Sequence, residues 1–137
     1  MASAHDMNSM RLALGEEKIS YFGFSNGSKL GATWATMFPS TVRAAVLDGT
    51  VDPNASTIEE VYANIEISVA AAPRLSANFA YGYSCALWPE AQAERITITG
   101  KGAGPIVVIG TTGDAATPLS STRNMAKGLE QGILIVV

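Results

Sequence analysis

The architecture of the chain follows from one stretch, Lys18-Ile-Ser-Tyr-Phe-Gly-Phe-Ser-Asn-Gly-Ser28, in which a predicted strand runs through a turn into a predicted helix. The strand is Lys18–Phe22, and the helix, Ser28–Phe38, places its large apolar residues on one side and ends before a proline. The turn between them, Gly23–Gly27, has the pattern Gly-x-Ser-x-Gly. In this strand-turn-helix setting the pattern predicts a nucleophile elbow, a strained turn that projects the hydroxyl of Ser25 above a sheet.

The turn has two interpretations on sequence alone. In the catalytic one, the backbone N–H of Asn26 points to the place where an oxyanion forms, and the amino end of the helix adds a favourable field. In the other, Ser25 caps the helix and the glycines only make the turn tight. The residues of the turn by themselves leave both interpretations open.

Predicted strands and helices alternate along the rest of the chain, which is typical of a parallel sheet with right-handed crossovers. Ile106–Ile109 is a continuous β-branched run, as expected of a parallel strand buried on both faces. The sequence therefore predicts an α/β fold with helices flanking a parallel β-sheet, its strands adjacent in chain order. The other predicted elements are the strands Val42–Leu47 and Ile133–Val137, the helices Asp6–Leu14, Ser56 or Thr57 to about Ala71, and Leu119–Leu129, and an irregular segment, Pro73–Pro89.

A second candidate site residue, Asp114, lies in the loop Gly110–Pro118, which follows the buried strand Ile106–Ile109. This places Asp114 at the carboxyl edge of the sheet, where α/β proteins hold their functional groups, and on the same edge as Ser25. A carboxylate there can orient a catalytic histidine and stabilise its charged form. The alternative is that Asp114 only binds the backbone of its own glycine-rich loop. Asp48 is the second choice for the acid, with capping of an Asp-Gly turn as its simpler role.

Composition narrows the functions and partners to be expected. The 137 residues suffice for one domain, and with 47% hydrophobic and 15% charged residues the chain is too apolar to be disordered. A net charge of −3 without a cluster of Lys and Arg argues against nucleic acid or an anionic membrane as a partner, and the apolar runs are too short to cross a bilayer. The sequence contains no metal-ligand cluster, phosphate loop or dinucleotide fingerprint, so neither a metal nor a cofactor is expected.

The remaining conspicuous residues have mainly structural interpretations. Cys85 is the only cysteine, which excludes an internal disulfide and predicts a buried thiol. Met1–Met10 lacks a basic region followed by an apolar one, so no signal peptide is predicted and the compartment stays open. Aromatic residues of the irregular segment can line a substrate pocket or, more simply, pack in the core: Tyr81, Tyr83 and Trp88. Three acidic residues without metal-ligand spacing predict a solvated helix face: Glu59, Glu60 and Glu66.

Three motifs occur in an order that is typical of one family. They are Leu14-Gly-Glu-Glu-Lys-Ile-Ser-Tyr-Phe-Gly-Phe-Ser-Asn-Gly-Ser28 with Val46-Leu-Asp-Gly-Thr-Val-Asp-Pro53, then Cys85-Ala-Leu-Trp-Pro89, then Gly110-Thr-Thr-Gly-Asp-Ala-Ala-Thr-Pro118. The chain resembles the tripeptidyl aminopeptidases, usually exported α/β-hydrolases related to prolyl aminopeptidases. The resemblance implies Ser25 as nucleophile, Asp114 as the triad acid and a peptide or ester substrate, with release of short peptides from free N-termini as the activity.

The chain also departs from the family's pattern. The family's triad histidine follows the last strand, whereas the only histidine here is His5, and the lid region, about residues 54–88, is shorter than the family's. We therefore expect the single domain 1–137 to represent the second half of an α/β-hydrolase fold, in a contracted or truncated form that is weak or inactive by itself. His5 is expected on the catalytic side of the sheet, because helices of this topology begin there, although a solvated terminal histidine is the simpler interpretation.

Three outcomes are compatible with these departures. The chain is a serine peptidase of reduced form, a small carboxylesterase, or a non-catalytic half-domain that needs a partner chain to supply the histidine. The strand Lys18–Phe22 is expected to form an edge of the sheet with apolar flanks, which predicts self-association or marginal folding.

Overall fold

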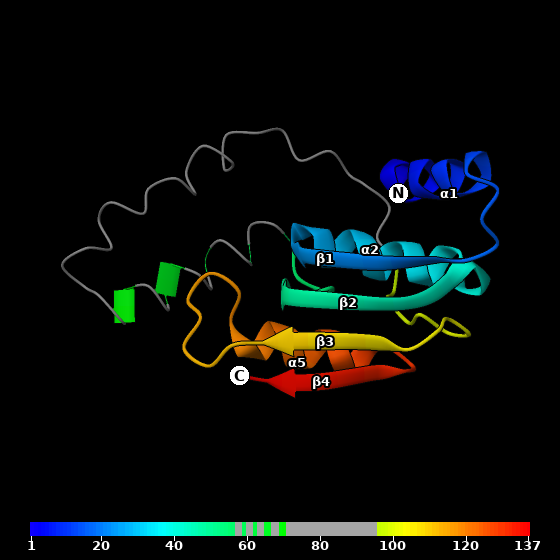
Figure 1. Ribbon diagram of the computed structural model, residues 1–137. Helices are drawn as coiled ribbons and strands as arrows, with labels where there is room; N and C mark the ends of the chain where they lie inside the picture. The colour runs from blue at the N-terminus through cyan, green and yellow to red at the C-terminus, as the bar shows by residue number, and fades with distance from the viewer. Residues whose placement is uncertain (57–58, 60–61, 63–64, 67–68, 71–95) are drawn as a thin grey trace.

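The computed structural model describes residues 1–56, 59, 62, 65–66, 69–70 and 96–137, and its centre is a four-stranded sheet (Figure 1). The strands are β1 (Ile19–Ser25), β2 (Val42–Thr50), β3 (Ile106–Gly110) and β4 (Gly132–Val136). Each strand pairs with the next in parallel, in the order β1-β2-β3-β4. The predicted α/β fold with parallel strands in chain order is therefore confirmed.

Two helices, α2 (Asn26–Met37) and α5 (Leu119–Gly128), cover the same face of this sheet. Gly31 of α2 lies against Leu47 of β2, and Thr122 of α5 lies against Gly110 of β3. Leu47 pairs with Val108, and Val108 shares a face with Gly110, two residues further along β3, so both helices lie on one side. The helix α1 (Ala2–Ala13) packs on α2, as Figure 1 also shows. The core lies between helices and sheet, and its largest fully buried apolar side chains are Trp34, Leu47, Ile106, Met125, Val42 and Val108.

The opposite face of the sheet carries two rows of paired residues. In the first row the neighbours are Phe22, Val46, Val107 and Ile133, and in the second they are Phe24, Asp48, Ile109 and Ile135. Phe22 and Phe24 are 61% and 67% exposed, and their ring centroids lie 6.1 Å apart. Val107 and Ile109 are only partly buried. The part of the chain that the structure describes thus buries one face of β3 and leaves the other face partly exposed. Within that part, the expectation that β3 is buried on both faces is not met.

The elements differ from their predicted boundaries most where they matter for the site. β1 continues past Phe22 to Ser25, and α2 begins at the next residue, so Gly23–Gly27 is not a separate turn. The strand extends because it stays paired with β2 as far as Ser25 and Thr50. The first helix begins at Ala2 rather than after Asp6, because the N–H groups of its first turn already bind the carbonyl of Met1.

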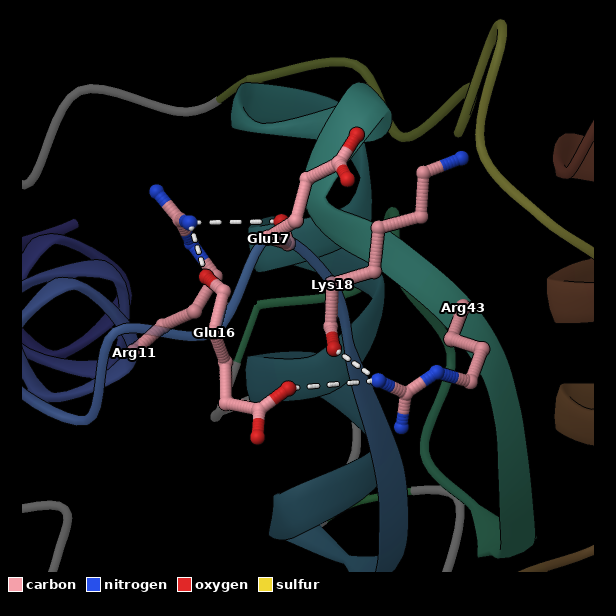
Figure 2. A network of polar contacts seen from close by, with 5 residues as sticks. All are labelled: Arg11, Glu16, Glu17, Lys18 and Arg43. Carbon is pink, nitrogen blue, oxygen red and sulfur yellow. Dashed lines mark hydrogen bonds and ion pairs between the residues drawn. The ribbon is translucent and has the colours of Figure 1, made fainter.

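Two arginines hold the connection from α1 to β1, as Figure 2 shows. Arg11 Nη1 donates to the carbonyl oxygens of Glu16 and Glu17, at 2.5 and 3.2 Å. Arg43 Nη2, from β2, donates to the carbonyl oxygen of Lys18 at 2.6 Å and contacts Glu16 Oε2 at 3.4 Å. The ion pair is exposed and contributes little by itself, but the bonds to three successive carbonyls fix the amino end of β1.

The predicted cap of the helix after β2 is confirmed at Ser56. The N–H of Ser56 donates to Glu59 Oε2 at 2.7 Å, and the N–H of Glu59 donates to Ser56 Oγ at 3.2 Å, which is a capping box. Residues 59, 62, 65–66 and 69–70 are helical. Most of the predicted lid, about residues 54–88, lies outside the described residues, and so do these residues singled out in the sequence: Glu60, Tyr81, Tyr83, Cys85 and Trp88.

Candidate active site

Ser25 occupies an unusual backbone conformation at the carboxyl end of β1. Its φ is 53° and its ψ is −128°, and it is the only non-glycine residue with positive φ in the part of the chain that the structure describes. A conformation of this kind costs about 1–3 kcal/mol and persists only where the surrounding structure enforces it. Ser25 is exposed and stands at the N-cap position of α2, yet its side chain makes no capping hydrogen bond. The interpretation of Ser25 as a side-chain helix cap is therefore wrong.

The first turn of α2 lies very close to β1, and one glycine makes this approach possible. A Cβ atom on Gly23 would lie 2.7 Å from the carbonyl oxygen of Gly27, closer than real Cβ contacts. The ring of Tyr21 fills the space beside Gly23 and Gly31, and its hydroxyl donates to the carbonyl oxygen of Gly27 at 2.8 Å. Burial raises the pKa of the Tyr21 phenol above its ordinary value, so Tyr21 stays a donor at neutral pH. The strand and the helix are thus locked together on either side of Ser25.

The carboxylate of Asp114 is held by its own loop. Oδ1 accepts hydrogen bonds from the N–H groups of Ala116 and Thr117, at 2.8 and 3.0 Å, and Oδ2 accepts one from Thr117 Oγ1 at 2.6 Å. Burial raises the pKa of Asp114, but the bonds from Thr117 and Ala116 outweigh this effect and leave the pKa below its ordinary value. Asp114 is therefore an oriented, ionised carboxylate. The structure thus contains the contacts expected from the simpler interpretation, in which Asp114 binds the backbone of its own loop. These contacts leave a lone pair on Oδ2 for another donor.

Ser25 and the Asp114 loop lie at the same edge of the sheet and are linked through the end of β2. Ser25 pairs with Thr50 of β2. Gly49, the residue before Thr50, has a φ of +52°, and a Cβ atom on it would lie 3.0 Å from Thr117 Oγ1. The strands β1 and β3 that lead to these two residues are two strand spacings apart, roughly 10 Å.

A comparison with known families agrees with this geometry. A family model described as alpha/beta hydrolase fold matches residues 1–80, which is more than half of the chain. The chain belongs to the alpha/beta hydrolase family. A second family model, described as TAP-like protein, matches residues 72–137 of this hydrolase.

Curated relatives of the hydrolase include two peptidases. The serine protease Hip1 of Mycobacterium tuberculosis is 50% identical over 56 residues, which are 41% of this chain and 11% of that protein. The tripeptidyl aminopeptidase of Streptomyces lividans is 45% identical over 56 residues, or 10% of its length. Among solved structures, Rv0554 from Mycobacterium tuberculosis superposes with a TM-score of 0.65 and 18% identity, over 98% of this chain and 62% of that one. The match to the curated relatives thus spans about a tenth of their length, and the structural likeness concerns the fold.

His5 lies beside the end of α2 that is far from Ser25. Its ring contacts the ring of Phe38 with centroids 5.3 Å apart, and Phe38 follows the carboxyl end of α2. Ser25 precedes the amino end of the same twelve-residue helix, and such a helix is about 18 Å long. The expectation that His5 lies on the catalytic side is therefore wrong, because α1 begins beside the far end of α2 rather than at the edge that carries Ser25.

Asp48 differs from its predicted position as well. It was expected to close β2, but the strand runs on to Thr50, so Asp48 lies inside the strand and beside Phe24 and Ile109. That position is on the sheet face that α2 and α5 leave uncovered. Asp48 is consequently the weaker candidate for an acid that serves Ser25.

Sequence patterns did not single out the side chains that support these two residues. Tyr21 and Thr117 bind the backbone or the carboxylate directly, and the buried Ser28 binds the carbonyl of Ser25. Each is a common residue type whose role depends on the folded neighbourhood. Within the described residues there is no group of three or more His, Cys, Asp and Glu that could hold a metal ion. Nor does the described part contain a helix long and apolar enough to cross a bilayer.

Proposed function

We propose that this alpha/beta hydrolase is a serine hydrolase of the peptidase kind, or the part of one that carries the nucleophile and the acid. One observation carries the proposal: Ser25 holds a strained backbone at the end of a parallel strand while its hydroxyl is not used to cap the following helix. Strain of this kind is retained where it serves a function, since a plain turn would relax it.

In the proposed reaction, Ser25 Oγ attacks the carbonyl carbon of an amide or ester and its proton passes to a general base. The carbonyl oxygen becomes an oxyanion, which the N–H of Asn26 stabilises at the amino end of α2. Collapse of this intermediate breaks the bond to the leaving amine or alcohol, which takes the proton from the base. Water then repeats the sequence on the acyl-serine and releases the acid. Asp114 orients the base and stabilises its charged form.

The base in this scheme is a histidine other than His5. Because His5 is the only histidine among the 137 residues, the base comes from beyond this sequence or from a partner chain. A serine hydroxyl without a base is a poor nucleophile, so these residues by themselves are expected to be weak or inactive. The second candidate function, a non-catalytic half-domain, predicts the same lack of activity. The observation that favours this second function is the placement of His5 beside Phe38.

The peptidase assignment is supported by the two relatives, a serine protease and a tripeptidyl aminopeptidase. The same nucleophile and oxyanion donor also hydrolyse esters, so a carboxylesterase remains the alternative within the proposed chemistry. Comparing a tripeptide p-nitroanilide with a p-nitrophenyl ester of similar size separates these two activities.

The role of Ser25 can be tested without knowing where the base comes from. Imidazole in the buffer can replace a missing histidine as proton acceptor, so it should accelerate labelling of the chain by a fluorophosphonate probe. We expect labelling to rise with imidazole concentration and to disappear in Ser25→Ala. Ser20→Ala is the matched control, because Ser20 is an exposed serine of the same strand, and it should label like the unmodified chain.

Two results would contradict the proposal. Labelling that survives Ser25→Ala would place the nucleophile elsewhere, and labelling that does not respond to imidazole would favour the non-catalytic half-domain. A chimera that adds the flanking segments of the Streptomyces lividans relative provides the positive arm. It should hydrolyse the tripeptide substrate, and Ser25→Ala or Asp114→Ala in the chimera should reduce the rate by about 10³-fold or more.

A further inference from the structure

The hydroxyl of Ser28 is completely buried and has both a donor and an acceptor partner. Ser28 Oγ donates to the carbonyl oxygen of Ser25 at 2.6 Å and accepts a hydrogen bond from the N–H of Val51 at 3.3 Å. A buried hydroxyl is costly unless it is hydrogen-bonded, so this side chain is tied to both neighbours. It joins the strained residue at the end of β1, the first turn of α2 and the segment that leaves β2.

Other contacts surround this bridge without replacing it. Gly23 permits the close approach of β1 and α2 but holds nothing in place, and the Tyr21 hydroxyl binds Gly27, two residues beyond Ser25. Lys29, the residue after Ser28, donates to the carbonyl oxygen of Ala55 at 3.1 Å and so ties the same helix to the segment after β2. In the contact of Ser28, by contrast, a side chain binds the backbone of the strained residue itself.

We infer that Ser28 is a positioning residue, whose hydroxyl holds the backbone of Ser25 in its positive-φ conformation and fixes it to the end of β2. The conformational part of this inference is independent of the chemistry of Ser25. The consequence for catalysis rests on the function proposed above: a relaxed Ser25 backbone would move its hydroxyl and the N–H of Asn26 away from their common target, and misplacement by about 1 Å can cost about 10²-fold in rate.

A thermodynamic cycle on stability tests the conformational part. Glycine adopts positive φ without strain, so Ser25→Gly should release the strain and raise the folding equilibrium constant of the chain by about five-fold or more. If the Ser28 hydroxyl enforces the strain, Ser25 can relax once that hydroxyl is removed. The gain from Ser25→Gly should then shrink to less than about two-fold in the Ser28→Ala background. Urea unfolding of the four proteins gives all the values.

The controls keep the cycle decisive. Ser25→Ala removes the same hydroxyl as Ser25→Gly but keeps the Cβ atom, so it should show no gain in either background. An equal gain from Ser25→Gly with and without the Ser28 hydroxyl would overturn the inference, because the rest of the fold would then enforce the strain. If Ser28→Ala does not fold, Ser28→Cys keeps the volume with a much weaker donor and acceptor and takes its place in the cycle.

Two further measurements separate this inference from the proposed function. In Ser28→Ala the amide of Val51 loses its acceptor and should exchange hydrogen at least about ten-fold faster, while the amide of Ala45, which binds the carbonyl of Pro105, should not change. Imidazole-dependent labelling of Ser25 should fall about ten-fold in Ser28→Ala and return in Ser28→Thr, which keeps the hydroxyl. A chain that never labels but shows the shrinking gain contradicts only the proposed function, and a chain that labels equally with and without Ser28 contradicts only the positioning role.

Discussion

A Cβ atom on Gly23 would lie 2.7 Å from the carbonyl oxygen of Gly27, whereas a Cβ atom on Gly27 would have no neighbour closer than 3.6 Å. The two glycines occupy equivalent places in the Gly-x-Ser-x-Gly pattern but have different physical roles. Gly23 allows the backbone of α2 to approach β1, whereas a Cβ atom on Gly27 would lie at an ordinary contact distance from the Tyr21 hydroxyl. The close approach, and with it the position of Ser25, depends on the first glycine.

This asymmetry predicts unequal effects of adding one methyl group. Gly23→Ala should destabilise the chain by about 2–3 kcal/mol, because a backbone atom cannot give way as a side chain can. Gly27→Ala should be neutral or stabilising, since alanine favours the helix by up to about 1 kcal/mol. Urea unfolding of the two variants measures the difference. Equal losses would show that the Gly27 position also needs the absence of a side chain.

Two threonines on helices, Thr122 and Thr36, differ in the hydrogen bonding of their hydroxyls. Thr122 of α5 is fully buried, and its hydroxyl has no hydrogen-bond partner among the residues that the structure describes. Thr36 of α2 is partly buried, and its Oγ1 donates to the carbonyl oxygen of Ala32 and accepts from the N–H groups of Thr99 and Gly100. Thr122→Val should be neutral or stabilising by up to about 1 kcal/mol, since valine has the same shape without an unpaired hydroxyl. Thr36→Val should cost about 1 kcal/mol or more, because it removes the acceptor of the partly buried Gly100 amide and of the exposed Thr99 amide. A loss in Thr122→Val as large as that in Thr36→Val would indicate a partner for the Thr122 hydroxyl in solution.

The strand order could be predicted because local signals were consistent along the chain. β-branched runs such as Ile106–Ile109 alternated with helical patterns, and parallel strands joined by crossovers usually stand side by side. The end of β1 was not predictable in the same way, since Gly23 normally argues for the end of a strand. Here the glycine lies inside the strand because a helix backbone approaches it, which is a tertiary contact that no local pattern encodes.

The candidate site was predictable to the level of its motifs. The glycine pattern marks Ser25, and the position after a buried strand marks Asp114, because both signals are local. The placement of His5 could not be predicted from such local signals. The helix α1 begins four residues before the expected N-cap Asp6, and His5 packs on Phe38, beyond the carboxyl end of α2. The contact of Ser28 with Val51, 23 residues further along the chain, likewise depends on the packing of α2 against the end of β2.

The hydrogen bonds of Asp114 predict a definite pH dependence of stability. Since they hold the pKa of the folded carboxyl below its ordinary value of 3.8, the unfolded chain binds more protons near that pH than the folded one. The stabilisation is therefore complete above about pH 5 and is lost as the pH falls through 3.8 and then through the folded value. Asp114→Asn keeps an acceptor for the two N–H groups but loses the charge, and should cost about 1 kcal/mol at pH 7.

The measurement is the difference in free energy of unfolding between the chain and Asp114→Asn from pH 7 to pH 2.5. This difference should shrink as the pH falls, because protonation of Asp114 removes the charge that Asp114→Asn already lacks. The other carboxyl groups are present in both proteins, so their titration cancels in the difference. Glu17→Gln, a change at an exposed residue of the α1–β1 connection, is the control and should show no such trend. A difference that grows towards low pH would mean that the pKa of Asp114 is raised rather than lowered by folding.

The exposed edge strand β1 is expected to mediate self-association of the chain. β1 is the edge strand of the described sheet, and its residues Phe22 and Phe24 are 61% and 67% exposed on the face that α2 and α5 do not cover. An edge strand offers unpaired N–H and C=O groups to another strand, and adjacent exposed aromatic rings add apolar area to such a contact.

We expect a second copy of the chain to pair at this edge, with dimers that increase with concentration in sedimentation velocity experiments. Phe22→Lys combined with Phe24→Ser should shift the chain to monomer, because a charged edge resists strand pairing. Leu14→Ser removes an equally prominent apolar side chain, 75% exposed at the end of α1, and should leave the dimer unchanged. A chain that stays monomeric at high concentration, or that dissociates equally with Leu14→Ser, would locate the association elsewhere or exclude it.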